Sequence, residues 1–236
     1  MSHVVNRQSG FTLVELMLAM GFVSVLLLAI AMTVIQIGNI YNRGITFKDV
    51  NQDGSSIANE LQNSIGQTVP FDLTSPDDYY HNDILVGGRL CTNKYSYIWN
   101  YGQELSSTPM NPNRNVFDGS SSEIHFVKAL DPSNEYCKDP IKKINPDGSI
   151  DLLDSGQHEL VIHSFDISSS STSTDPRTGQ TLYNIVFQLG TNGNGSVRLD
   201  SGTYWICKPP SESGSDPLYC SINQYSITAR AGNGPI

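Results

Sequence analysis

The chain has 236 residues, of which 16 % are charged, and its formal net charge is −9. Phosphate contacts need clustered Lys and Arg, so a composition with 14 basic against 23 acidic residues argues against a broad nucleic-acid-binding surface. A hydrophobic content of 38 %, much of it gathered near the start of the chain, is too low for a polytopic membrane protein.

The first predicted element is an apolar helix over residues 11–35, in which Glu15 is the one formal charge. A helix of this length extends about 37 Å, which exceeds the hydrocarbon thickness of a bilayer of about 30 Å. The sequence has no second stretch of this kind, so it predicts a single membrane-spanning helix.

A conventional secretory signal is the competing interpretation of this segment. Arg7 would be its basic residue, Leu16–Leu28 its apolar core, and Ala29–Ala31 its cleavage site. The product would then be a secreted, soluble β protein. Glu15 at the start of the apolar core, and apolar residues that continue past Ala31, disfavour this alternative.

The residues around the start of the apolar run, SGFTLVE at 9–15, carry a more specific pattern. A short polar leader ends in Gly10, Phe11 follows, and Glu15 is the fifth residue after the glycine. This pattern resembles the processing site of type IV prepilins and type II secretion pseudopilins. The resemblance implies a leader over residues 1–10, cleavage after Gly10 by the prepilin peptidase, and N-methylation of the new terminal residue, Phe11.

Glu15 is the residue to which the resemblance assigns assembly. A carboxylate inside lipid costs about 2.5–3.5 kcal/mol, so it needs a partner. The resemblance implies that Glu15 of an incoming subunit neutralises the terminal amine of its neighbour. Thr12 and Glu15 also have the spacing of a capping box, and the alternative is that Glu15 only caps its own helix.

The helical pattern continues beyond the apolar run, over residues 36–69. Apolar or small residues recur there at intervals of three and four, which is typical of an amphipathic helix. They are Ile37, Ile40, Tyr41, Gly44, Phe47, Val50, Gly54, Ile57, Leu61 and Ile65. Gly66 and Pro70 end the helix. Asp49–Glu60 also matches the EF-hand pattern, but a calcium loop would interrupt a repeat that runs through it.

Residues 70–236 form the predicted β-rich head. The predicted strands are 95–101, 123–130, 159–167, 182–189, 203–207 and 219–229, and a long hairpin loop is expected in the Ser-rich stretch 168–179. The expected fold class is α+β, with a long N-terminal transmembrane-to-amphipathic helix packed on an antiparallel β-sheet domain. That is the pilin fold which the resemblance implies. The size of the chain favours a minor pilin or pseudopilin of the J-type or W-type.

Four cysteines, Cys91, Cys137, Cys207 and Cys220, follow the membrane segment, on the side where disulfides persist. Three pairings are possible. We favour Cys207 with Cys220, which closes a short loop and leaves Cys91 with Cys137; four free thiols are the alternative. The resemblance agrees, because pilins often carry a C-terminal loop closed by a disulfide.

No pattern in the sequence predicts catalysis. It has no G-x-S-x-G or P-loop, and His158 and His163 are five residues apart in a predicted strand, which disfavours a metal pair. Three acidic residues are predicted to lie in a turn, Asp147, Asp151 and Asp154. They could bind calcium, but a turn exposed to solvent is the favoured interpretation. We therefore expect a non-enzymatic structural subunit without a cofactor or metal.

The resemblance also implies the surroundings of this protein. It would be a single-pass protein of the cytoplasmic membrane before assembly and part of a pilus or pseudopilus at the cell surface afterwards. Its partners would be other pilin subunits, the prepilin peptidase, the inner-membrane assembly platform and membrane lipid. The alternative is an adhesin on the same stalk, binding through the aromatic strand 95–101 or the Ser-rich stretch. For the aromatic face of strand 95–101, however, packing against the long helix or another sheet layer is favoured over exposure.

Overall fold

The computed structural model describes residues 11–73, 79–83, 86–105, 115–116, 124–139, 141–153, 159–175, 178–192, 195–200 and 204–232. The predicted leader, with Gly10, lies outside these residues. The chain divides into two compact units, Met1–Arg43 and Gly44–Ile236. We call the second unit the head.

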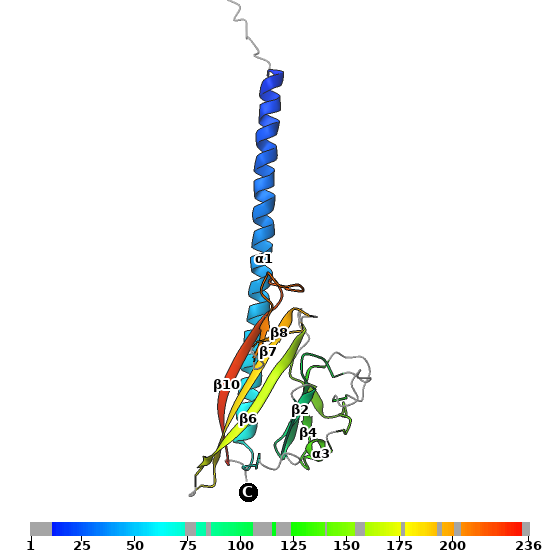
Figure 1. The fold of residues 1–236 in the computed structure, drawn as a ribbon, viewed down its shortest axis with the longest axis vertical. Coiled ribbons are helices and arrows are strands. Elements are labelled where there is room, and N and C mark those ends of the chain that lie inside the picture. The colour runs from blue at the N-terminus through cyan, green and yellow to red at the C-terminus, as the bar shows by residue number, and fades with distance from the viewer. Residues whose placement is uncertain are drawn as a thin grey trace, which may run out of the picture. The chain divides into compact units, whose positions relative to one another are not determined.

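The longest element is helix α1, which spans Leu13–Gly66 (Figure 1). The strands that follow it form antiparallel sheets, so the predicted α+β class is confirmed. The helix ends at Gly66, as the sequence predicts. The predicted boundaries at residues 35 and 69 stay predictions.

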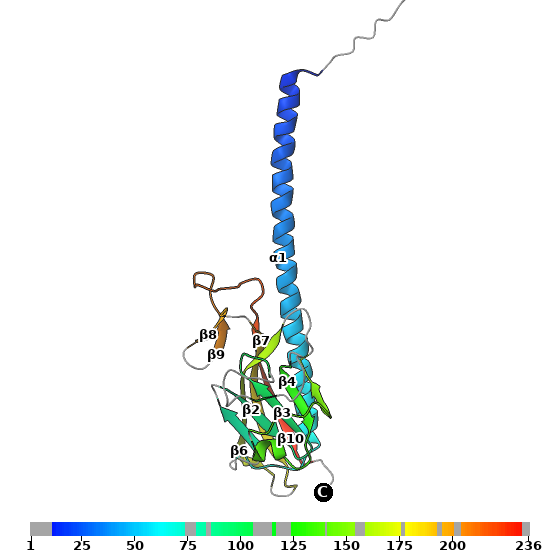
Figure 2. The same cartoon turned by 90° about the vertical axis from the view of Figure 1, so that its right-hand side faces the viewer.

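Among the described residues, the strands of the head form three antiparallel sheets, where the sequence indicates one (Figures 1 and 2). A five-stranded sheet has the order β1 (Tyr80–Asp83), β2 (Gly87–Cys91), β3 (Tyr95–Asn100), β4 (Phe126–Leu130) and β5 (Ser149–Asp151). A three-stranded sheet has the order β10 (Ile222–Ala231), β7 (Thr181–Thr191) and β6 (Leu160–Thr174). Strands β8 (Val197–Asp200) and β9 (Tyr204–Cys207) pair separately, and α3 (Glu135–Lys138) is a single helical turn.

The Ser-rich stretch 168–179 differs from the loop that the sequence predicts. Strand β6 continues to Thr174, and Ser168 and Ser169 pair with Asn184 and Tyr183 of β7. The expected loop is therefore short, with its turn between Asp175 and Gln180. Serine is a weak strand former by itself, and pairing with the regular strand β7 extends β6 through this stretch.

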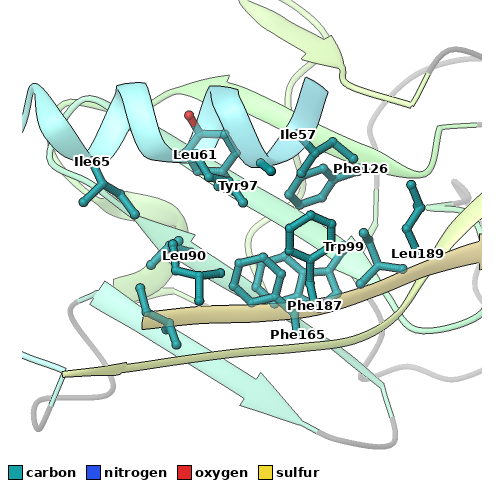
Figure 3. Close-up of a cluster of buried hydrophobic side chains, with 14 of the residues drawn as sticks. Ile57, Leu61, Ile65, Leu90, Tyr97, Trp99, Phe126, Phe165, Phe187 and Leu189 are labelled. Atoms are coloured by element: carbon teal, nitrogen blue, oxygen red, sulfur yellow. The ribbon is translucent and has the colours of Figure 1, made fainter. Parts of the chain in front are cut away.

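The main hydrophobic core lies between the head part of α1 and the two larger sheets (Figure 3). Ile57, Leu61 and Ile65 of α1 are buried against Tyr97, Trp99 and Phe126 of the five-stranded sheet and Phe165, Phe187 and Leu189 of the other sheet. A second cluster covers the opposite face of the five-stranded sheet, where Ile98 and Val127 pack with Tyr136 of α3. The central strands β2, β3 and β4 are therefore largely buried on both faces, while the edge strands β1 and β5 are partly exposed.

Helix α1 contributes to this core only from Thr46 onward. Its buried positions are Thr46, Val50, Gly54, Ile57, Ala58, Leu61, Ser64 and Ile65. The apolar stripe that the sequence predicts begins earlier, but Ile37, Ile40, Tyr41 and Phe47 are 59–72 % exposed. The first half of the predicted stripe thus has no packing partner within the described residues.

Two disulfides join Cys91 to Cys137 and Cys207 to Cys220, the pairs that the sequence favours. The first links β2 to α3, and the second links the end of β9 to the segment before β10. They close loops with sequence separations of 46 and 13 residues, and such cross-links stabilise a fold mainly because they restrict the unfolded chain.

Arg89 of β2 is a buried cation that the sequence analysis does not anticipate. Its side chain is 1 % exposed. Its guanidinium donates to the Asn115 Oδ1 atom at 2.6 Å and to three carbonyl oxygens at 2.8–3.0 Å, those of Tyr136, Asp139 and Lys142. Burial lowers the pKa of Arg89 to about 10, so the group stays charged at neutral pH. It holds the segment around α3 against the sheet.

Candidate processing and assembly site

The N-terminal end of α1 is closed by Thr12 and Glu15. The Glu15 Oε2 atom accepts hydrogen bonds from the backbone N–H and the hydroxyl of Thr12, both at 3.0 Å. The N–H of Glu15 donates to the Thr12 hydroxyl at 3.3 Å in return. This reciprocal pair satisfies backbone donors that the first turn of a helix leaves open. The capping spacing in the sequence is therefore realised, and Phe11 next to it is 85 % exposed.

The first part of α1 presents apolar side chains on every side. The most apolar stretch of the helix contains no buried residue. Ser24 and Thr33 donate their hydroxyls to the carbonyls of Met20 and Ala29, which hides their polarity within the helix. By length and composition α1 is able to cross a membrane, and a signal sequence would have the same properties.

The aromatic strand 95–101 does not form a binding surface. Tyr97 and Trp99 are fully buried and Tyr101 is 8 % exposed. The Trp99 ring lies 4.3 Å from the Phe165 ring, centroid to centroid, across the interface between the two large sheets. An adhesin that binds through Tyr97 and Trp99 is therefore ruled out, because these side chains build the core.

Within the head, a small group of polar side chains links α1 to the five-stranded sheet, and no sequence pattern predicts it. The Glu60 Oε1 atom accepts from the Lys128 ammonium at 2.6 Å and from the Tyr97 hydroxyl at 3.0 Å. The same ammonium lies 4.0 Å from the centre of the Tyr95 ring. A Glu on α1 and a Lys on a strand carry no local pattern that would pair them.

Gly54 lies where the side chain of Tyr225 on strand β10 packs against α1. The Tyr225 ring occupies the space that a Cβ at residue 54 would need, with ring atoms 2.1–2.3 Å from that position. The Tyr225 hydroxyl donates to the Val50 carbonyl at 2.8 Å, and the Asn223 side-chain amide donates to the Asn51 Oδ1 atom at 2.8 Å. The sequence places Gly54 only among the small residues of the helical repeat, whereas in the structure the absence of a side chain at this glycine makes room for an aromatic ring.

We expect Gly54→Ala to lower the free energy of unfolding by about 2 kcal/mol. Overpacking costs about 1–3 kcal/mol and loss of the Tyr225 bond about 1 kcal/mol, against about 1 kcal/mol gained in helix propensity. A Cβ at residue 44 would have no atom within 4 Å, so Gly44→Ala should stabilise the helix. Urea unfolding of the full chain in detergent micelles, followed by tryptophan fluorescence, compares the two. Equal effects at both positions would contradict the packing role of Gly54.

The patterns that suggested metals form no site among the described residues. Asp49–Glu60 lies inside α1, so it forms no calcium loop. Asp154 and His158 lie outside the described residues. Asp151 is the last residue of β5 rather than a turn residue, and its carboxylate accepts three backbone N–H bonds. His163 is buried beside the Thr191 carbonyl, 3.2 Å from its Nε2 atom, and burial lowers its pKa to about 4.

No protein-family model, curated protein or solved structure matches this chain. The function of the site therefore has to follow from its own residues.

Proposed function

We propose that this protein is a structural subunit of a type IV pilus or of a related secretion pseudopilus, assembled through α1. The observation that carries the proposal is the order of features at the N-terminus: Gly10, then Phe11, then the capped start of α1, whose apolar run up to residue 35 has Glu15 as its one charge. An ordinary anchor has no need of a carboxylate at this depth, because the charge costs about 2.5–3.5 kcal/mol in lipid.

Cleavage after Gly10 would create the partner that Glu15 lacks. The new terminal amine on Phe11 carries a positive charge, which attracts a carboxylate strongly where lipid excludes water. One carboxylate oxygen of Glu15, Oε2, is engaged by Thr12, and the other, Oε1, makes no such bond there. Glu15 can therefore keep its cap and accept the amine of a neighbouring subunit.

The finer proposal is a minor subunit of the J-type or W-type, held in the cytoplasmic membrane before assembly and exposed on the filament afterwards. Its support is the length of the chain and a head built from three sheets with two disulfides. Other pilin subunits, the prepilin peptidase, the assembly platform and lipid would be its partners.

Mass spectrometry of the protein from its native membrane or filament fraction tests the proposal. We expect a mature chain that starts at methylated Phe11. The matched control is Gly10→Leu, for which we expect the uncleaved precursor, because the change removes the glycine after which the resemblance places the cut. A chain that starts after Ala31 would instead show an ordinary signal sequence and remove the helical stalk.

A further inference from the structure

Strand β10 has a long outer edge, part of which is uncovered among the described residues. Strand β10 is the first in the order β10-β7-β6, and all ten of its residues pair with β7 without a bulge. The edge strands β1 and β5 of the other large sheet have only four and three residues. The backbone of β6 at Phe165 is contacted by Tyr80, Asn82 and Tyr101. In Figure 1, β10 is the red strand at the margin of its sheet.

The hydrogen-bond register shows which backbone groups of β10 point outward. The Thr191 N–H donates to the Ser221 carbonyl at 3.0 Å, so the odd-numbered residues from Asn223 onward bond to β7. The even-numbered residues direct their N–H and C=O groups away from β7. Their side chains Gln224, Ser226, Thr228 and Arg230 are exposed, while Ala229 and Ala231 are buried.

Some of these outward groups already have partners. The Gln62 side chain donates to the Thr228 carbonyl at 3.1 Å, and the Gly232 N–H donates to the Thr68 carbonyl at 2.8 Å. The Gln224 N–H donates to the neighbouring Asn223 side chain at 2.9 Å. Four outward groups have no hydrogen-bond partner in the described part of the chain. They are the Gln224 carbonyl, the N–H and carbonyl of Ser226, and the Thr228 N–H. We call residues 224–228 the open edge.

The open edge lacks the features that prevent an edge strand from pairing with another chain. Natural edges are guarded by Lys, Pro or bulges. Residues 222–229 contain no charged residue and no Pro, in a chain whose net charge is −9. An uncharged row of amides and carbonyls at strand spacing is complementary to one kind of partner, the extended backbone of another segment.

We propose that the open edge pairs with an extended, uncharged segment of a different subunit, which adds a strand beside β10. This inference rests on the proposed function, because assembly brings other subunits alongside the head. The bonds of Gln62 and Thr68 end the docking stretch at Thr228. Twofold pairing of two β10 strands would close a dimer and stop filament growth. The strand that pairs with β10 is therefore not β10 of a second copy.

Ser226→Pro tests the pairing with little effect on the fold. It removes an outward N–H, leaves the bonds to β7 in place, and proline is tolerated on edge strands. Ser226→Thr is the matched control that keeps the N–H. In the full chain expressed in its host, we expect Ser226→Pro to enter the filament fraction at least tenfold less than Ser226→Thr. Processing at Phe11 and thermal unfolding in micelles should stay unchanged.

Hydrogen exchange of the wild-type chain gives a second measurement. We expect the amides of Ser226 and Thr228 to exchange at least tenfold more slowly in filaments than in micelles. Normal entry of Ser226→Pro into filaments, or equal exchange in both states, would overturn the pairing. Disulfide-linked homodimers of Ser226→Cys in filaments would show that two β10 strands pair with each other, and would therefore overturn the choice of a different strand as the partner. Absence of the wild-type chain from filaments would overturn the proposed function as well, whereas processed filaments with unprotected amides overturn only this inference.

Discussion

Glu15→Gln should reduce the amount of protein in filaments more than tenfold while cleavage after Gly10 continues. Glutamine at this position still forms a capping box with Thr12, so the start of α1 is preserved. What is lost is the negative charge that would pair with the terminal amine of a neighbour. The expected factor follows from the cost of leaving a charge unpaired in lipid, about 2.5–3.5 kcal/mol, where about 1.4 kcal/mol corresponds to tenfold. Quantitative mass spectrometry of membrane and filament fractions measures it.

Thr12→Val is the companion variant that separates charge from capping. It removes the hydroxyl that bonds to the Glu15 carboxylate and keeps the charge. If Glu15 only caps its own helix, Glu15→Gln will assemble like the wild type and Thr12→Val will be the damaging change. That result would contradict the assembly role. Methylation of Phe11, read from the same spectra, reports on processing in both variants.

Arg89→Met should lower the free energy of unfolding of the head by about 3–5 kcal/mol. The change leaves the carbonyls of Tyr136, Asp139 and Lys142 and the Asn115 amide oxygen without their donor, in a place where the side chain is 1 % exposed. Replacement of a buried ion pair by apolar residues is often harmless, but that applies when both partners are replaced. Here the acceptors are mostly backbone carbonyls, which remain after the substitution.

Arg198→Met is the control for Arg89→Met. Arg198 pairs with Glu212 at 3.4 Å, with side-chain exposures of 43 % and 36 %, and exposed pairs contribute about 0–1 kcal/mol. Urea unfolding in micelles with fluorescence detection of Trp99 and Trp205 compares the two variants. A difference of less than about 1 kcal/mol between them would mean that water replaces the guanidinium in the head.

Several strands of the head are missed by sequence patterns for a physical reason. Strand β2 reads GGRLC, with two weak strand formers and a cation, yet all five residues are buried. A Cβ at Gly88 would lie 2.5 Å from the Trp99 ring, so the glycine is needed for packing across the sheet. Strand β5 has three residues and exists through its pairing with β4. Such strands depend on pairing with strands that are distant in the sequence, and the hydrophobic periodicity of a short segment carries no information about this pairing.

Features that depend on near neighbours along the chain could be predicted from the sequence. These are the apolar run of α1, the Thr12–Glu15 cap and the end of the helix at Gly66, because a helix places residues three and four apart on one face. Tertiary structure alone decided the burial of Arg89, the Tyr225 ring at Gly54 and the exposure of the β10 edge. Each depends on contacts between segments far apart in the chain, whose packing selects which polar groups are satisfied and which are left open.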